Sequence, residues 1–151
     1  MNELSGHFVG QEHRLPVRIY WEDTDGSGIV YHARFLHFAE RARTEVLRQL
    51  GIQQQDMLQD TGISFVLRRL TADYRAPARL DDLLEVRTRA TRLSAVTLEM
   101  EQEIWRDRQC LTVIAVQLVC INRAGRPVRL PAAVKTAIDR AIGAKPALAD
   151  A

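Results

Sequence analysis

One helical pattern followed by a long β pattern limits the possible folds most strongly. Between residues 33 and 50, apolar side chains recur at spacings of three and four, as on one face of a helix. The apolar positions are Phe35, Ala39, Ala42, Val46 and Leu50. From Ile63 to Asn122, alternating runs indicate strands with one apolar and one polar face. The sequence predicts an α+β fold in which an antiparallel sheet of about five to six strands wraps around one long central helix.

Shorter patterns place the remaining elements. Val17–Trp21 alternates like a short strand, and residues 53–60 form a second helical pattern that ends before Gly62. Residues 110–121 are apolar at nearly every position, which is typical of a strand that is covered on both faces. A turn is expected at 122–127, followed by a terminal helix at 131–142.

The length and composition indicate a single domain. With 151 residues, of which 46% are hydrophobic, the chain can bury roughly 70% of its unfolded surface without a covalent staple. The expected domain covers residues 15–142, with an N-terminal tail at 1–14 and a C-terminal tail at 143–151. A net charge of +2 without a basic, aromatic-rich run argues against nucleic acid as a partner.

The cysteines and the N-terminus indicate a cytoplasmic protein. Cys110 and Cys120 are ten positions apart in one predicted strand, or about 33 Å, whereas a disulfide requires Cα atoms within about 7 Å. Two buried thiols in a reducing compartment are therefore expected. The first 14 residues lack the basic and apolar regions of a secretory signal, and no apolar run approaches the ~20 residues of a membrane span.

An acidic, glycine-containing loop at residues 22–32 precedes the long helix and is the candidate catalytic segment. Gly26 and Gly28 permit a tight turn and a close approach of a ligand to the main chain. The first amides of a helix have no intrahelical partner and carry the positive end of the helix dipole. A carboxylate from this loop beside those amides is suited to attack on a carbonyl group.

Two motifs in this chain closely resemble acyl-CoA thioesterases associated with the Tol-Pal system, which belong to the 4-hydroxybenzoyl-CoA thioesterase group of hot-dog proteins. The resemblance extends from Val17 to Ile138. Phe35 is the main departure, because family members often carry Tyr there. The matching segments are Glu22–Asp25, Gly28, Val30–His32, Phe38, Glu40–Glu45, Tyr74 and Pro77–Asp82.

The resemblance implies hydrolysis of an acyl-CoA thioester to a free carboxylic acid and CoA, with Asp25 as the catalytic carboxylate. Asp25 either attacks as a nucleophile or activates water as a general base, and the sequence leaves both routes open. The amide of His32, with Tyr31 beside it, is expected near the thioester oxygen, and the His32 imidazole is expected to orient water or to protonate the leaving group. Neither a metal nor a cofactor is expected, because CoA is part of the substrate.

Other charged residues receive different expectations. Asp23 is expected to be a structural carboxylate of the loop, since a second charge facing the same site would disfavour ionisation of Asp25. Glu40 on the long helix is expected to form an ion pair with a nearby arginine. The candidates for binding the CoA phosphates are Arg68, Arg69, Arg126 and Arg129.

Exposed sheet edges predict a homodimer at minimum, with a tetramer as the other option. An acyl carrier protein is a possible further partner. Two alternatives to a hydrolase remain open: a hot-dog hydratase, and a non-catalytic acyl-carrier or envelope-associated interaction module. The length or aromatic character of the acyl group is not determined by the sequence.

Overall fold

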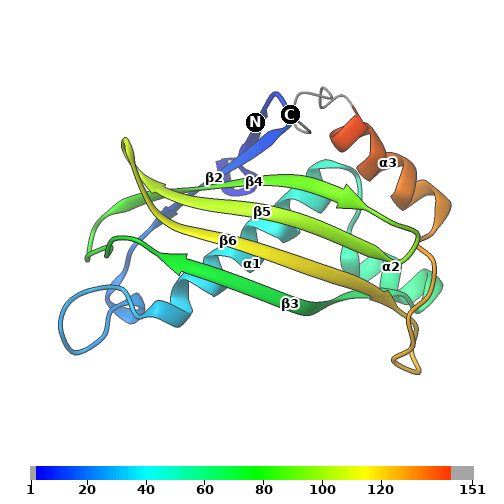
Figure 1. Cartoon of the computed structure of the whole chain (residues 1–151), viewed down its shortest axis with the longest axis horizontal. Coiled ribbons are helices and arrows are strands. Elements are labelled where there is room, and N and C mark those ends of the chain that lie inside the picture. Colours follow the sequence, from blue (N-terminus) through cyan, green and yellow to red (C-terminus); the bar gives the residue numbers. More distant parts are fainter. Residues whose placement is uncertain (1–2, 144–151) are drawn as a thin grey trace.

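The helices and strands follow the predicted pattern over most of the chain. The computed structural model describes residues 3–143 (Figure 1). The strands are β1 (His7–Val9), β2 (Glu12–Arg18), β3 (Ser64–Tyr74), β4 (Leu83–Leu93), β5 (Thr97–Arg106) and β6 (Gln109–Ile121). The helices are α1 (His32–Gln49), α2 (Gln54–Thr61) and α3 (Ala132–Gly143), with short 3₁₀ helices η1 (Glu3–Ser5) and η2 (Trp21–Asp23).

The strands form one six-stranded antiparallel sheet in the order β1-β2-β4-β5-β6-β3. The long helix α1 lies across one face of this sheet (Figure 1). Phe35, Phe38, Ala39, Ala42 and Val46 of α1 are buried in the core. The inward positions of β4 and β5 alternate with partly exposed ones, as the sequence predicted. The expected α+β architecture is therefore confirmed.

Strand β3 forms one edge of the sheet. It pairs with β6 from Ser64↔Ile121 to Tyr74↔Thr112 and has no second partner strand among residues 3–143. Three large side chains on it are exposed: Val66, Leu67 and Tyr74. An 11-residue free edge that carries apolar side chains is a surface on which a second chain can pair.

The structure differs from the sequence-based expectation at the N-terminal strand. Val17–Trp21 was expected to be a strand, but β2 ends at Arg18 and the chain then turns into η2. Buried Asp23 stabilises this turn, because its Oδ2 accepts a hydrogen bond from the Tyr20 amide at 2.8 Å. Trp21 is consequently 76% exposed.

The boundary expected at residue 15 lies inside β2. The sheet already begins at His7, and the residues expected to form an N-terminal tail contribute η1, β1 and the first half of β2. The C-terminal tail expected at 143–151 lies outside the described residues, apart from Gly143 at the end of α3. Both cysteines are free, and burial raises the pKa of the Cys120 thiol to about 11.

Buried His13 gives the fold a predictable pH dependence. Its Nε2 lies 2.7 Å from the Ser5 carbonyl, and its Nδ1 is buried without a partner. Burial lowers the pKa of His13 below the ordinary value of 6.5. The unfolded chain therefore takes up this proton at higher pH than the folded chain, so the free energy of unfolding should fall as the pH drops below about 6.5.

Urea unfolding of the wild type and of His13→Asn across pH 5.0 to 8.0 measures this contribution. The variant should lack part of the wild-type decrease between pH 6.5 and the lower pKa of the folded state. Identical pH profiles for the two proteins would contradict the assignment.

Candidate active site

The acidic loop is a short, closed turn before α1. A bridge between Thr24 and Val30 closes it, and the Asp25 amide donates to the Ile29 carbonyl at 2.9 Å. Gly28 has a φ of 83°, a left-handed conformation that strains residues with a Cβ. Val30 anchors the loop to the rest of the fold, because its amide donates to the Ala78 carbonyl at 2.8 Å.

The Asp25 carboxylate is exposed and has one oxygen occupied. Its Oδ1 accepts hydrogen bonds from the Ser27 hydroxyl at 2.6 Å and from the Ser27 amide at 2.8 Å. The Ser27 hydroxyl is the main reason that the pKa of Asp25 lies below its ordinary value. The Asp25 side chain is therefore ionised at neutral pH, and no hydrogen bond among the described residues engages Oδ2.

Replacing Ser27 with alanine should move the acid limb of the pH–activity profile. Loss of the hydroxyl hydrogen bond raises the pKa of Asp25, so an activity that requires the ionised Asp25 carboxylate should begin to fall at a higher pH than in the wild type. The measurement is kcat/KM as a function of pH. Ser27→Thr retains a hydroxyl and should keep the wild-type profile; an unshifted acid limb in Ser27→Ala would show that this hydrogen bond does not control the active carboxylate.

The His32 amide, which the resemblance placed near the thioester oxygen, and the amide of the neighbouring Tyr31 have different surroundings. The Tyr31 amide donates to the Asp23 carbonyl at 2.9 Å and is therefore engaged. The next two amides, of His32 and Ala33, have no acceptor among the described residues, whereas the Arg34 amide donates to the Tyr31 carbonyl at 2.8 Å. The unengaged donors lie at the first turn of α1, directly after the Asp25 loop.

Tyr74, at the end of β3, holds the start of α1. Its hydroxyl donates to the His32 carbonyl at 2.9 Å, and its ring lies edge-on to those of His32 and Phe35. The His32 imidazole is exposed and also contacts the Tyr31 ring, with centroids 4.5 Å apart. Phe35, the departure from the resembled family, is buried between Phe38 and Tyr74.

The other carboxylates near α1 have different surroundings. Asp23 is buried, and Arg34 Nε lies 3.6 Å from its Oδ1, which confirms the expected structural role. Arg34 also approaches Glu22, with Nη2 and Oε2 3.5 Å apart. The ion pair expected for Glu40 is absent within residues 3–143, where this side chain is exposed.

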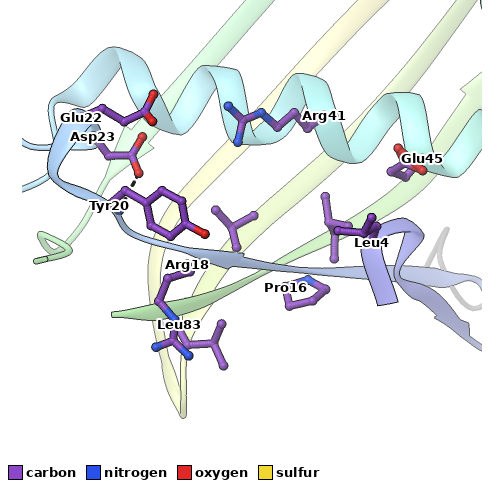
Figure 2. Close-up of a pocket in the computed structure, with 11 residues that line it drawn as sticks. Leu4, Pro16, Arg18, Tyr20, Glu22, Asp23, Arg41, Glu45 and Leu83 are labelled. Atoms are coloured by element: carbon purple, nitrogen blue, oxygen red, sulfur yellow. Dashed lines mark hydrogen bonds between the residues drawn. The ribbon is translucent and has the colours of Figure 1, made fainter. Parts of the chain in front are cut away.

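A cavity of about 590 Å³ lies between β2, η2 and α1 (Figure 2). Asp23 faces it beside Tyr20, while Arg41 and Glu45 enter it from α1. Asp25 does not line this cavity or the three others of about 350 to 570 Å³ found among the described residues. Within a single chain, the Asp25 carboxylate therefore lies on an open surface.

Residues 3–143 contain neither a metal-binding cluster nor a helix suited to span a membrane. No group of three or more His, Cys, Asp and Glu side chains is arranged to hold a metal ion. None of the described helices has the length and apolar character needed to cross a membrane.

The four arginines proposed for CoA binding are exposed and fall into two groups. Arg68 and Arg69 lie near the middle of β3. Arg126 and Arg129 follow β6, whose end pairs with Ser64, so they lie beyond the opposite end of β3 from Tyr74. Since 11 strand residues span roughly 33 Å, the structure does not bring this second pair to Asp25 of the same chain.

Ser27, which donates two hydrogen bonds to the candidate carboxylate, was not among the residues expected at the site. A serine two positions after an aspartate often forms such a side-chain turn, so the Asp25–Ser27 spacing carried a usable signal. No local pattern pointed to the contact between Tyr74 and His32, because these residues are 42 positions apart in the chain.

Comparisons with known proteins agree with this geometry. The family model "Thioesterase superfamily" matches residues 27–112, more than half of the chain. Acyl-CoA thioesterase YbgC of Haemophilus influenzae is 45% identical over 124 residues, which cover 82% of this chain and 91% of that protein. Acyl-CoA thioester hydrolase YbgC of Escherichia coli is 44% identical over 110 residues, or 72% of this chain and 81% of that protein.

A solved structure provides an independent match to the fold. The crystal structure of a probable thioesterase from Bartonella henselae superposes with a TM-score of 0.76 and 38% identity, covering 80% of this chain and 99% of that one. With the six-stranded antiparallel sheet, this match confirms the predicted hot-dog fold. The chain belongs to the thioesterase superfamily.

Proposed function

We propose that this protein is an acyl-CoA thioesterase in which Asp25 is the catalytic carboxylate and the His32 amide stabilises the thioester oxygen. The observation that carries the proposal is the juxtaposition, in one short loop, of an ionised and exposed carboxylate with unengaged amides at the start of a helix. The names of the relatives from Haemophilus influenzae and Escherichia coli support the same substrate class.

The geometry suits both mechanisms that the sequence left open. Asp25 Oδ2 either attacks the carbonyl carbon, giving a mixed anhydride and free CoA thiolate, or removes a proton from an attacking water. In both routes negative charge develops on the thioester oxygen, where the His32 and Ala33 amides and the helix dipole stabilise it. The His32 imidazole, exposed beside this turn, orients water or protonates the leaving thiolate.

The active unit in this proposal is a homodimer formed through the free edge of β3. Edge pairing would cover Val66 and Leu67 and satisfy the unpaired main-chain groups of the strand. It would also enclose the Asp25 surface, which a single chain leaves open. The resemblance to the Tol-Pal-associated thioesterases adds further parts to the proposal. The protein is placed in the cytoplasm, with a link to the Tol-Pal system and with an acyl carrier protein as a partner. A tetramer of two such dimers is the other option for its assembly.

The CoA phosphates are assigned to the exposed arginines of the β3 edge and of the turn after β6. In an edge-paired dimer, Arg126 and Arg129 of one subunit approach the Tyr74 end of the other, which brings them near its active site. Arg68 and Arg69 lie beside the pairing edge itself. Planar guanidinium groups suit bidentate contacts to phosphate oxygens.

A panel of acyl-CoA substrates tests the function directly. Short aliphatic, long aliphatic and aromatic acyl-CoA are each incubated with the purified protein, and free thiol is measured over time. Release above the uncatalysed rate for at least one saturated acyl-CoA is expected, and it separates a hydrolase from a hydratase, which requires an unsaturated acyl group. Background release across the whole panel would favour a non-catalytic binding module instead.

A further inference from the structure

Arg43 is a buried cation that forms no ion pair among the described residues, although the Glu40 carboxylate, one helical turn earlier on α1, attracts it from a distance. It lies on α1 with 8% of its surface exposed, and Nη1 donates to Gln102 Oε1 at 3.0 Å. None of the ion pairs found among residues 3–143 includes it. Burial removes water from this guanidinium, and the exposed Glu40 carboxylate compensates for that only in part, so binding of an anion at the remaining N–H groups would be favourable.

A cavity of about 350 Å³ opens beside this guanidinium. Arg43 and Thr44 of α1 and Gln54 of α2 contribute its polar part, and Phe65 and Leu67 of β3 contribute apolar walls. The other N–H groups of the guanidinium have no acceptor among the described residues. They retain some contact with solvent, and Arg43 lines the cavity, so we take these groups to face it. The apolar walls suit the methylene groups of a short acyl chain, and the guanidinium suits a carboxylate at the end of that chain.

The position of the cavity along β3 relates it to the active site of a second subunit. Phe65 and Leu67 lie near the start of β3, whereas Tyr74, whose hydroxyl binds the His32 carbonyl, lies at its end. Antiparallel pairing of two β3 edges about their midpoint places Ser64 opposite the partner subunit's Tyr74. The Arg43 cavity of one subunit then lies beside the Asp25 loop of the other.

We propose that Arg43 of one subunit binds the terminal carboxylate of a dicarboxylic acyl-CoA whose thioester is cleaved by the partner subunit's Asp25. The inference rests on the proposed hydrolase function and names its substrate class. Glu40 also lines the cavity, but it is exposed and solvated. Because charges interact more strongly where water is excluded, the buried guanidinium dominates over the solvated carboxylate of Glu40.

The first test compares pairs of substrates that differ in the terminal group. For the wild type, kcat/KM for adipyl-CoA should exceed that for heptanoyl-CoA about tenfold or more. A charge-assisted hydrogen bond between the terminal carboxylate and the buried guanidinium accounts for a preference of this size. Glutaryl-CoA and hexanoyl-CoA form a second pair. Equal values within both pairs would overturn this inference and leave the hydrolase function intact, whereas no hydrolysis of any substrate would overturn both.

Variants of Arg43 assign the preference to this side chain. Arg43→Met should remove the preference for adipyl-CoA while retaining turnover of heptanoyl-CoA, and Arg43→Lys should restore part of it. Arg41→Met is the matched control, because Arg41 lines a different cavity and should keep the wild-type preference. Thermal unfolding verifies that each variant is folded, and Arg43→Gln replaces Arg43→Met if the latter is not. A preference that survives loss of the guanidinium would overturn the inference.

Mixed dimers test whether the contribution crosses the interface. Asp25→Asn and Arg43→Met chains with different affinity tags are co-expressed, and dimers that carry both tags are isolated. If Arg43 acts on the partner subunit's site, each mixed dimer contains one site with both native residues and hydrolyses adipyl-CoA with the wild-type preference. If Arg43 acted within its own chain, no site would hold both residues and the preference would be absent.

Discussion

Replacing Asp25 with asparagine is expected to lower kcat for acyl-CoA hydrolysis by about 10³-fold. The amide is nearly the same size as the carboxylate, but it carries no negative charge, so it neither attacks the thioester carbonyl nor removes a proton from water. Asp25 is exposed and its main-chain hydrogen bonds do not depend on the side chain, so the stability of the protein should change little. The measurement is free-thiol release under saturating substrate, together with thermal unfolding.

Asp139→Asn is the matched control for this experiment. Asp139 is an exposed carboxylate on α3 that pairs with Lys135 at 2.7 Å, remote in sequence from the loop. Its replacement should leave kcat at the wild-type value. An Asp25→Asn protein that releases CoA at the wild-type rate would show that another group is the catalyst.

The two chemical routes differ in where oxygen from water first appears. In a single turnover in H₂¹⁸O, a nucleophilic Asp25 acquires the label when water attacks the aspartyl carbonyl of the mixed anhydride, and mass spectrometry of the loop peptide detects it. With a general base, the label appears only in the carboxylic acid product. Both results are compatible with the arrangement of Asp25 Oδ2 and the His32 amide.

Replacing Gln102 with leucine is expected to lower the free energy of unfolding by about 3 to 5 kcal/mol. Gln102 is fully buried in β5, where its Nε2 donates to the Ala39 carbonyl at 2.8 Å and to Thr88 Oγ1 at 3.0 Å. Its Oε1 accepts from Arg43. Leucine removes all three hydrogen bonds and deprives the buried Arg43 guanidinium of its Gln102 acceptor, which is why the effect exceeds that of one lost hydrogen bond.

Urea unfolding followed by circular dichroism measures this difference. Gln55→Leu is the control, because Gln55 is exposed on α2 and makes no side-chain hydrogen bond among the described residues. It should change the free energy of unfolding by no more than about 0.5 kcal/mol. A Gln102→Leu protein as stable as this control would mean that the network does not hold α1 against the sheet.

Local patterns in the sequence carried most of the fold. The helical repeat at residues 33–50 became α1, and the alternating runs between 63 and 122 became β3 to β6, because burial on one face imposes a period that is visible in the sequence. The strand predicted at Val17–Trp21 was wrong after Arg18, where a local turn replaces the alternating pattern. Asp23 bonds to the Tyr20 amide and ends the strand, and alternation alone gives no sign of this.

The motif also pointed to the Asp25 loop and to the His32 amide, but it did not show how the neighbouring Tyr31 amide is engaged. Tyr31 and His32 are adjacent in the sequence, yet only the His32 amide is unengaged, because loop closure directs the Tyr31 amide to the Asp23 carbonyl. Likewise, Arg43 is one of three arginines within residues 41–48, and the sequence does not distinguish the buried one from the other two.

The sequence by itself determined the order and type of the elements from α1 onward, the superfamily and the loop that holds the candidate carboxylate, because these depend on residues that are close together in the chain. Only the tertiary structure decided the contacts between distant residues, such as Gln102 with Arg43 and Tyr74 with His32. It also decided that β3 is an edge strand with one partner strand in the described part of the chain. The physical reason is that burial and hydrogen bonding arise only when the sheet packs against α1. That packing decides which charged groups are desolvated and which hydrogen-bond donors remain unpaired.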